Sequence, residues 1–496
     1  MTSTVRHSGL LLSKIKHKQR LGSILESTKT KIQRSACAMS IIEHHQEKLD
    51  LSQTIHGFSQ LVGFSKLSTH VFGRHHGEFS LLQIIEWLLT TKFLGRSLYR
   101  AQPNPRFTTR TVRNYLNDGR TNWQRLTCLI AQALIKYLRP FIHTHRRLAF
   151  ILDDTLLTRD TAKKTELLAR TFDHDDQVYK KGFRALTLAW SDGDTLVPVD
   201  YALMSSKDAK NRIGGASTNQ DLRTLGGRRR AQAVRKMTDV SVELIKQALA
   251  NGLKVGYVLC DSWFSSPRMF LALKRLGLDT IAMVKKSSKV HYLYRKRHYS
   301  IPALYKRLAS SKYHTKANYR YACVVQAEVE QPDGSVEIFP VKLVFVSNRG
   351  QSDRFLVFAT TKQSLHPEEI IQMYGRRWQI EGYFKIAKQY LRLDRSQVQS
   401  YDGLCAHIAV AMMAYDILAW RQRQEADVRT LGDLFYNMNE AMPDLALTQA
   451  LAWLLEELNL IQATGTTEMS SALNNVMGQF EAHLPQALET QLGIAA

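Results

Sequence analysis

Four side chains that could act together on a phosphate lie close together in the sequence. Tyr374, Arg377, Glu381 and Lys388 are separated by three, four and seven residues. These offsets predict one face of an α-helix. A lone carboxylate between an aromatic hydroxyl and two cations suits a metal ion held beside a phosphate. The alternative is a solvated helix on which Arg377 and Glu381 form an ordinary i,i+4 ion pair, worth a few tenths of a kcal/mol.

Two aspartates follow short apolar runs that are typical of buried strands. Asp153 follows Leu148–Leu152, and Asp261 follows Val255–Cys260. The carboxyl ends of strands are where α/β sheets usually carry their chemistry. Asp154 is an alternative to Asp153, because successive residues of a strand face opposite sides of the sheet.

The elements that would position these acids predict an α/β fold. Strands are expected at 148–152, 183–190, 195–201, 255–260 and 280–284, with a hairpin at 191–194 and a helix at about 231–250. Three strands joined by hairpins, then a helix, a strand, a helix and a strand, indicate a mixed sheet with an α/β crossover. This order matches the ribonuclease-H-like fold, in which the first and fourth strands are neighbours. Asp153 and Asp261 would then lie together, and two close carboxylates call for a divalent cation.

The chain resembles the DDE transposases of the insertion-sequence-4 type. Tyr374, Arg377, Glu381 and Lys388 match every position of the YREK signature of that family, which is Tyr-x-x-Arg-x-x-x-Glu, six residues and Lys. The segments 153–155 (Asp-Asp-Thr) and 261–264 (Asp-Ser-Trp-Phe) resemble the first and second Asp motifs of the family. Because the first motif is commonly Asp-x-Thr, we favour Asp153 over Asp154.

The resemblance implies both a site and a mechanism. Asp153, Asp261 and Glu381 would form the catalytic triad and bind Mg²⁺, with Mn²⁺ able to substitute. Two metal ions about 4 Å apart could activate a water or a DNA 3′-hydroxyl and stabilise the leaving oxygen. Cleavage and strand transfer could therefore share one site. The family's DNA-holding positions correspond here to Tyr374, Arg377 and Lys388.

The likeness covers about residues 148–388 and the helical segment 404–420. We expect a ribonuclease-H-like core at 148–286 and 365–425, interrupted by a β-rich insertion at 287–364. A helical, basic DNA-binding region is expected at 1–147 and a helical C-terminal region at 426–496. Within 1–147, a helix that begins after Thr108 or Thr109 could present Arg110 and Arg113 to a DNA groove. The alternative is a basic helix that only packs on its neighbour.

The charge balance of the chain predicts a polyanionic partner. The 496 residues include 68 Lys and Arg against 44 Asp and Glu, a formal charge of +24. The basic loop 207–230 is expected to bind DNA phosphates, although a solvated charge run is the alternative. Its candidate contacts are Arg228, Arg229 and Arg230.

Two tryptophans, an acidic group and the cysteines each have an ordinary structural interpretation beside a functional one. Trp263 and Trp378 lie beside matched positions and could stack on an unpaired base, but packing is the commoner role. The acidic group at 173–176 is a rival metal cluster, yet it lacks a strand-end setting and is typical of a polar loop. Five widely spaced cysteines predict reduced thiols rather than disulfides or a zinc site.

These observations predict a DNA transposase that binds terminal inverted repeats and target DNA and acts as a homodimer. No apolar run long enough to span a membrane is apparent, and we expect the enzyme to work on DNA in a prokaryotic cytoplasm. Two alternatives stay open. One is a non-catalytic regulator descended from a transposase, and the other is a ribonuclease-H-like nuclease that cuts without strand transfer.

Overall fold

The computed structural model describes residues 51–71, 78–101, 104–173, 176–215, 221–310, 319–348 and 351–424, which belong to one compact unit. The region expected at 1–147 is thus described only in part, and the region expected at 426–496 lies outside the described residues, as do His174 and Asp175 of the acidic group.

Helices form the first part of the described chain. They are α2 (Leu51–Leu61), α3 (Phe64–Val71), α4 (Leu81–Phe93), α5 (Thr109–Leu116) and α6 (Trp123–Leu138), with short 3-10 turns at Leu98–Arg100 and Arg139–Phe141. Ser80 begins α4 with a capping box to Gln83, and the side chain of Thr108 accepts a hydrogen bond from the Thr111 amide to begin α5. The predicted N-cap of α5 is therefore Thr108.

A mixed sheet forms the centre, and its core has the predicted order. The strands are β1 (Ala149–Thr158), β2 (Ala169–Asp173), β3 (Val178–Ser191), β4 (Leu196–Met204), β5 (Tyr257–Cys260) and β6 (Asp279–Met283). They lie in the order β4-β3-β1-β5-β6, with β2 pairing the far end of β3. β3 is antiparallel to β1, whereas β5 is parallel to β1 and β6 is parallel to β5. The first and fourth core strands are neighbours, as a ribonuclease-H-like order requires.

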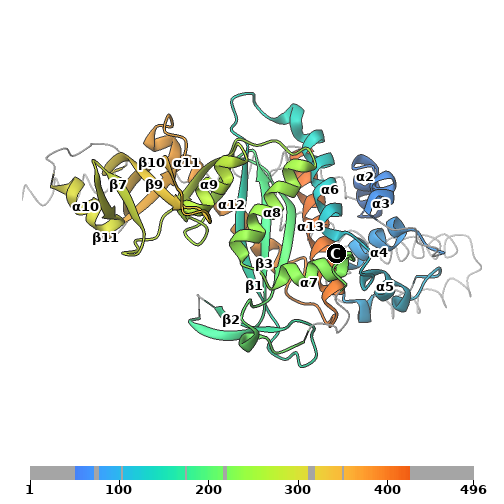
Figure 1. Cartoon of the computed structure of the whole chain (residues 1–496). Coiled ribbons are helices and arrows are strands. Elements are labelled where there is room, and N and C mark those ends of the chain that lie inside the picture. The colour runs from blue at the N-terminus through green and yellow to red at the C-terminus, as the bar shows by residue number, and fades with distance from the viewer. Residues whose placement is uncertain are drawn as a thin grey trace, which may run out of the picture. The chain divides into compact units, whose positions relative to one another are not determined.

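Helices and a turn connect these strands. They are a 3-10 turn at Ala209–Asn211, α7 (Leu225–Ala233), α8 (Met237–Ala250) and α9 (Pro267–Arg275). In Figure 1, α8 lies across the strands β1 and β3, and its buried side chains include Leu244 and Ile245. The single long helix expected at about 231–250 is in fact two helices, because Val234 to Lys236 leave the helical path between α7 and α8.

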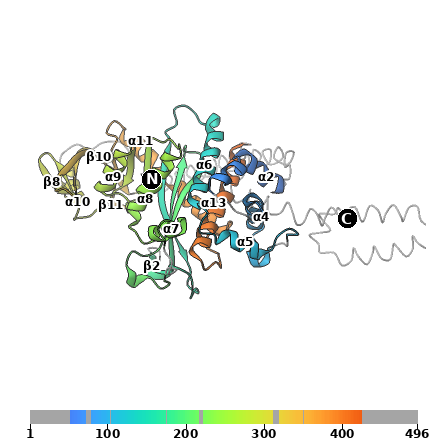
Figure 2. The same ribbon diagram turned by 45° about the vertical axis from the view of Figure 1, so that its right-hand side comes forward.

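The segment after β6 extends the same sheet. Its elements are β7 (His291–Tyr294), β8 (Arg297–Ser300), α10 (Ile301–Ala309), β9 (Tyr321–Glu330), β10 (Val336–Asn348) and β11 (Gln351–Thr360). β11 pairs antiparallel with β6, so the order continues as β6-β11-β10-β9-β7-β8. Figures 1 and 2 both show these strands on the opposite side of the core strands from α2–α6.

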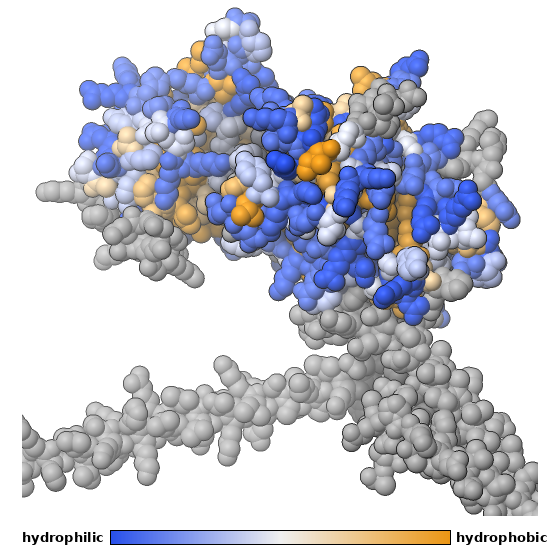
Figure 3. Space-filling view, turned by 90° about the horizontal axis from the view of Figure 1, so that it is seen from below, coloured by the Kyte–Doolittle hydropathy of each residue, from blue (hydrophilic) through white to orange (hydrophobic). Residues whose placement is uncertain are grey.

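Three helices complete the described chain: α11 (Pro367–Gly375), α12 (Trp378–Gln389) and α13 (Tyr401–Gln424). α13 packs against α6, α4 and β4. It is long and apolar enough to cross a membrane, but 94% of its apolar window is buried inside the protein, which is the usual setting of a core helix. Figure 3 shows mostly hydrophilic side chains on the face that it presents, as the charge balance leads one to expect.

Candidate active site

The two strand-end aspartates lie next to each other. The parallel pairing of β1 with β5 ends where Leu152 faces Cys260, and Asp153 and Asp261 are the next residues of the chain on each side. β5 ends there, but β1 continues beside β3 to Thr158, so Asp153 is not at the strand end that the sequence predicted. Backbone hydrogen bonding thus fixes both acids at the point where the β1–β5 pairing ends. The carboxylate of Asp261 accepts a hydrogen bond from the Trp263 amide at 2.8 Å, which orients it at the turn after β5.

Asp153 and Asp154 point to different partners. β1 continues to Thr158, so both residues lie within the strand and their side chains face opposite sides of the sheet. Asp154 accepts a hydrogen bond from Arg184 at 2.6 Å. Asp153 instead accepts one from Arg377. The side chain that joins the YREK segment is therefore that of Asp153.

Arg377 bridges Asp153 and Glu381. Its Nη1 atom lies 2.8 Å from Oδ2 of Asp153, and its Nη2 atom lies 2.6 Å from Oε1 of Glu381. The arginine side chain is only 9% exposed, while that of Glu381 is 39% exposed. Arg377 and Glu381 are thus more than an i,i+4 ion pair on a solvated helix. The buried arginine also connects them to Asp153 of β1, 224 residues away in the chain.

The YREK segment is not one continuous helix face. α11 ends at Gly375 and α12 begins at Trp378, with a turn at Arg376 and Arg377 between them. This break lets the Arg377 side chain reach back toward β1. Tyr374 is buried, its ring centroid lies 4.6 Å from that of Phe358, and the Arg377 guanidinium lies 5.7 Å from its centre.

Burial controls the protonation of this cluster. It raises the pKa of Asp153 to about 7, against the opposing effect of Arg377, while the charges of Asp154 and Asp261 raise the pKa further. Burial likewise raises the pKa of Tyr374 to about 12, so its hydroxyl keeps its proton at neutral pH. The site therefore holds a carboxyl group that a cation would help to ionise.

The donor atoms suit a hard divalent cation, but the present side-chain positions do not close a site for one. Carboxylate oxygens are the ligands that Mg²⁺ prefers. In the part of the chain that the structure describes, no three His, Cys, Asp or Glu side chains are grouped to hold a metal. The guanidinium of Arg377 supplies the positive charge between Asp153 and Glu381. A metal ion placed between Asp153 and Glu381 would therefore compete with Arg377 for their oxygen atoms.

The remaining candidates near the three acids are half-buried or exposed. Lys388 is in the last turn of α12, seven residues or about 10 Å along the axis from Glu381. Trp263 is 53% exposed and Trp378 is 62% exposed, so neither is a packed core residue. A cation lies over each ring: Lys285 at 4.4 Å from the centre of Trp263 and Arg377 at 5.2 Å from the centre of Trp378.

Two of the three arginines assigned to phosphate binding are buried, so that prediction is wrong for them. Arg228, Arg229 and Arg230 lie in the helix α7 rather than in a loop. Arg229 donates to Asp402 at 2.5 Å, and Arg230 donates to Glu166 at 2.6 Å and pairs with Asp402 at 2.8 Å. Arg228 is exposed and stays a candidate.

The candidate DNA-reading helix has the expected amphipathic arrangement. α5 buries Val112, Tyr115 and Leu116, and it exposes Arg110 and Arg113. A set of cations near this helix was not predicted from the sequence: Lys92, Arg96, Arg100, Arg392 and Arg395. A signal was present in the Gly95-Arg96-Ser97 turn after an apolar helix, but the second half of the set comes from nearly 300 residues further along the chain.

Comparison with known proteins gives one match to a family model. Residues 81–326 match the DDE superfamily endonuclease model, a range that includes Asp153 and Asp261 and ends before Glu381. No curated protein matches the chain. The large mixed sheet, with helices before and after it, agrees with a DDE nuclease fold. The matched region is thus similar to the DDE superfamily endonucleases, which indicates an enzyme of the nuclease or transposase kind with DNA as its substrate.

Proposed function

We propose that the protein is a DNA transposase that binds the terminal inverted repeats of an insertion sequence and carries out metal-dependent strand cleavage and strand transfer. The observation that carries this proposal is the bridge that Arg377 forms between Asp153 and Glu381, beside a strand register that places Asp261 next to Asp153. Strand register brings the two aspartates together, and Arg377 ties Glu381 to Asp153.

The three acids would hold Mg²⁺, or Mn²⁺ in its place. Bound there, the metal would lower the pKa of an attacking water and neutralise charge on the phosphate. Of the two acids that Arg377 connects, Asp153 is the more buried, whereas the side chain of Glu381 is exposed enough to adjust its position. Arg377 keeps the carboxylates paired when no other cation is present, and its guanidinium is suited to a phosphate oxygen once it is released.

Charge and exposure support DNA as the partner. The net charge of +24 favours a polyanion, and the exposed rings of Trp263 and Trp378 beside the acids suit an unpaired base at the reaction centre. Tyr374 would support the site from within rather than through direct contact, because its side chain is buried. Action on two transposon ends would need a pair of protomers, so we propose a homodimer that works on DNA in the cytoplasm.

The test is a cleavage and joining assay with the full-length protein. A labelled duplex that carries the end of the element is incubated with Mg²⁺ and a target duplex, and both nicked and joined products are resolved. The Glu381→Gln variant should lose both products and keep DNA binding, because it removes a ligand charge while conserving the side-chain shape. Retained cleavage by this variant would refute the assigned site.

A matched control is Glu368→Gln, which makes the same chemical change at an exposed position of α11. It should keep both products. Nicking without joining by the wild-type protein would favour the nuclease alternative. DNA binding with no product of either kind would favour the non-catalytic regulator.

A further inference from the structure

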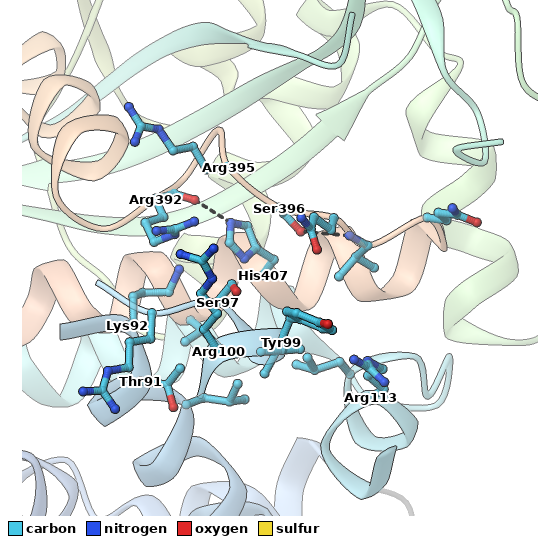
Figure 4. Close-up of a pocket in the computed structure, with 18 of the residues that line it drawn as sticks. Thr91, Lys92, Ser97, Tyr99, Arg100, Arg113, Arg392, Arg395, Ser396 and His407 are labelled. Atoms are coloured by element: carbon cyan, nitrogen blue, oxygen red, sulfur yellow. Dashed lines mark hydrogen bonds between the residues drawn. The ribbon is translucent and has the colours of Figure 1, made fainter. Parts of the chain in front are cut away.

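A large cavity lies away from the triad, between the N-terminal helices and the segment that joins α12 to α13. Its volume is about 880 Å³. One wall comes from the end of α4, the turn after it and α5. The other wall comes from residues 392–400 and the start of α13, and Figure 4 shows side chains from both walls pointing toward the same space.

The lining of this cavity is positively charged. None of the residues that line it is Asp or Glu. Its basic side chains come from three separate stretches of the described chain: Lys92, Arg96, Arg100, Arg113, Arg392 and Arg395. The five arginine charges around one space repel one another, and this repulsion is relieved when an anion enters.

Lys92 is the buried member of this set. It is only 7% exposed, and its Nζ atom donates to the main-chain oxygen of Leu391 at 2.9 Å. Burial and the nearby Arg392 lower the pKa of Lys92 to about 7. Arg392 in turn donates to the Gly95 carbonyl at 2.7 Å. Carbonyl oxygens orient these two side chains but leave their charges without a carboxylate counterion in these contacts.

The Arg392 backbone is also held in an uncommon shape. Its φ of 53° lies in the left-handed region, which a residue other than glycine adopts at a cost. The ring of His407 is 2.8 Å from the Arg392 carbonyl oxygen, and Nε2–H donates to it, so the strained residue is fixed from both its main chain and its side chain. These two contacts hold the guanidinium of Arg392 in the lining of the cavity.

An aromatic side chain stands beside these cations. Tyr99 lines the cavity and is 83% exposed. Proteins that bind a single nucleic acid strand commonly combine exposed aromatic rings with cations, because the cations contact the phosphates and the rings stack on bases. We propose that this cavity binds a stretch of a DNA strand, with the arginines on its phosphates and Tyr99 against a base.

A DNA strand fits better than a small anion. A free phosphate would engage only a few of the six cations, whereas successive phosphates of a strand could engage those of both walls. Arg113 lies on the exposed face of α5, so the charged lining continues onto the helix that we expect to face DNA. The assignment rests on the proposal that DNA is the substrate, and it adds a second contact besides the triad.

This second contact would be linked to the catalytic helix. The chain leaves α12, which carries Glu381, and runs directly into the wall that carries Arg392 and Arg395. DNA held in the cavity would therefore contact residues 392–400, which follow α12 in the chain. The inferred role is to position the strand, while the chemistry stays at the triad.

The test is DNA binding by the full-length chain without Mg²⁺, measured by fluorescence anisotropy with labelled single-stranded and duplex oligonucleotides over a range of salt. Arg100→Gln combined with Arg395→Gln should weaken binding about tenfold or more. The slope of log affinity against log salt should become shallower by about 1.4 for a single strand, because two phosphate contacts are lost. Tyr99→Ala should weaken single-strand binding about tenfold, and Tyr99→Phe should not.

The matched control is Lys296→Gln combined with Arg297→Gln, which removes two exposed cations from the β7–β8 hairpin. Equal losses in the control and in the cavity variant would overturn the assignment, because net charge would then explain the effect. Tight competition by inorganic phosphate, with no effect of the cavity variants on DNA, would also overturn it. If the wild type binds no DNA at all, the proposed function fails, whereas intact binding and cleavage in the cavity variants refutes only the cavity.

Discussion

Nη1 of Arg377 lies 2.8 Å from Oδ2 of Asp153, although the two residues are 224 positions apart in the chain. The same guanidinium donates to Glu381, so one arginine acts as a counterion to two acids that we assign to metal binding. A metal ion and this arginine would compete for the same oxygens. The metal-free protein is thereby spared the repulsion between two close carboxylates.

Replacement of Arg377 should lower the stability of the metal-free protein but raise its affinity for Mg²⁺. In Arg377→Gln, loss of the positive charge should raise the pKa of Asp153 above its present value of about 7 and lower the stability of the metal-free protein. At a pH high enough to ionise both acids, Mg²⁺ should bind several-fold more tightly, because its competitor is gone. Titration calorimetry above about pH 8 measures this affinity.

Arg376→Gln is the control for that experiment, because Arg376 donates to the Arg147 carbonyl and not to the acids. Its Mg²⁺ affinity should equal that of the wild type. Weaker Mg²⁺ binding by Arg377→Gln would show that the arginine supports the metal site instead of competing for it.

Asp153 and Asp154 should respond differently to the same change. Asp153→Asn should abolish both nicking and joining while leaving the fold intact. Asp154→Asn should keep the chemistry but lower the free energy of unfolding by about 1–3 kcal/mol, since the partly buried Arg184 loses its charged partner. Activity assays and thermal unfolding of both variants measure this contrast, and loss of activity in Asp154→Asn alone would exchange their roles.

The pH dependence of stability follows from the raised pKa of Asp153. The folded protein keeps a proton that the unfolded chain releases between about pH 4 and about pH 7, so the stability of the metal-free protein should fall as pH rises through this range. Mg²⁺ needs the ionised carboxylate, so its stabilising effect should grow over the same range and level off above it. Melting temperatures recorded with Mg²⁺ and with a chelator, at successive pH values, test both slopes. In Asp153→Asn both should flatten, and a slope unchanged from the wild type would assign the titration to another group.

Loss of the buried ion pair between Arg229 and Asp402 should lower the stability of the protein more than its affinity for DNA. Arg229→Gln leaves Asp402 without one of its two partners, and breaking a buried pair in this way costs about 3–5 kcal/mol. Arg228→Gln, one residue earlier on the exposed side of α7, should leave the melting temperature nearly unchanged and reduce only the affinity for DNA. A stable Arg229→Gln protein with weakened DNA binding would return Arg229 to the phosphate-binding set.

The sequence was a good guide wherever a local pattern determines the structure. Apolar runs that end in an acid located β5 and the first half of β1, although β1 runs past Asp153 to Thr158. The register of the parallel pair then places Asp153 and Asp261 side by side. Thr108 was one of two expected N-caps, and its hydroxyl alone accepts the capping hydrogen bond. In each case the determining interactions lie within a few residues of one another.

The sequence was a poor guide to the side chains whose partners lie far away in the chain. Arg228 and Arg229 are adjacent in one run of three arginines, and the partners that bury Arg229, which are Asp402 of α13 and the Thr121 carbonyl, lie more than a hundred residues away. The turn at Arg376 and Arg377 follows Gly375, which is a weak signal of a helix end, while the regular YREK spacing favoured a continuous helix. The charged cavity combines residues 92–113 with 392–410, so no local window contains it.

The pairing of Arg229 and Arg230 with Asp402 also bears on how the protein is made. Both arginines leave the ribosome well before Asp402, which follows Arg229 by 173 residues. Until α13 is synthesised, closing α7 over the sheet would bury two guanidinium groups with too few counterions, which is strongly unfavourable. Arg377, which balances Asp153, also comes late. A partly synthesised chain therefore has β1, β5 and α7 before it has the counterions that α7 needs, and we expect α7 to pack in its final position only after α13 has been made.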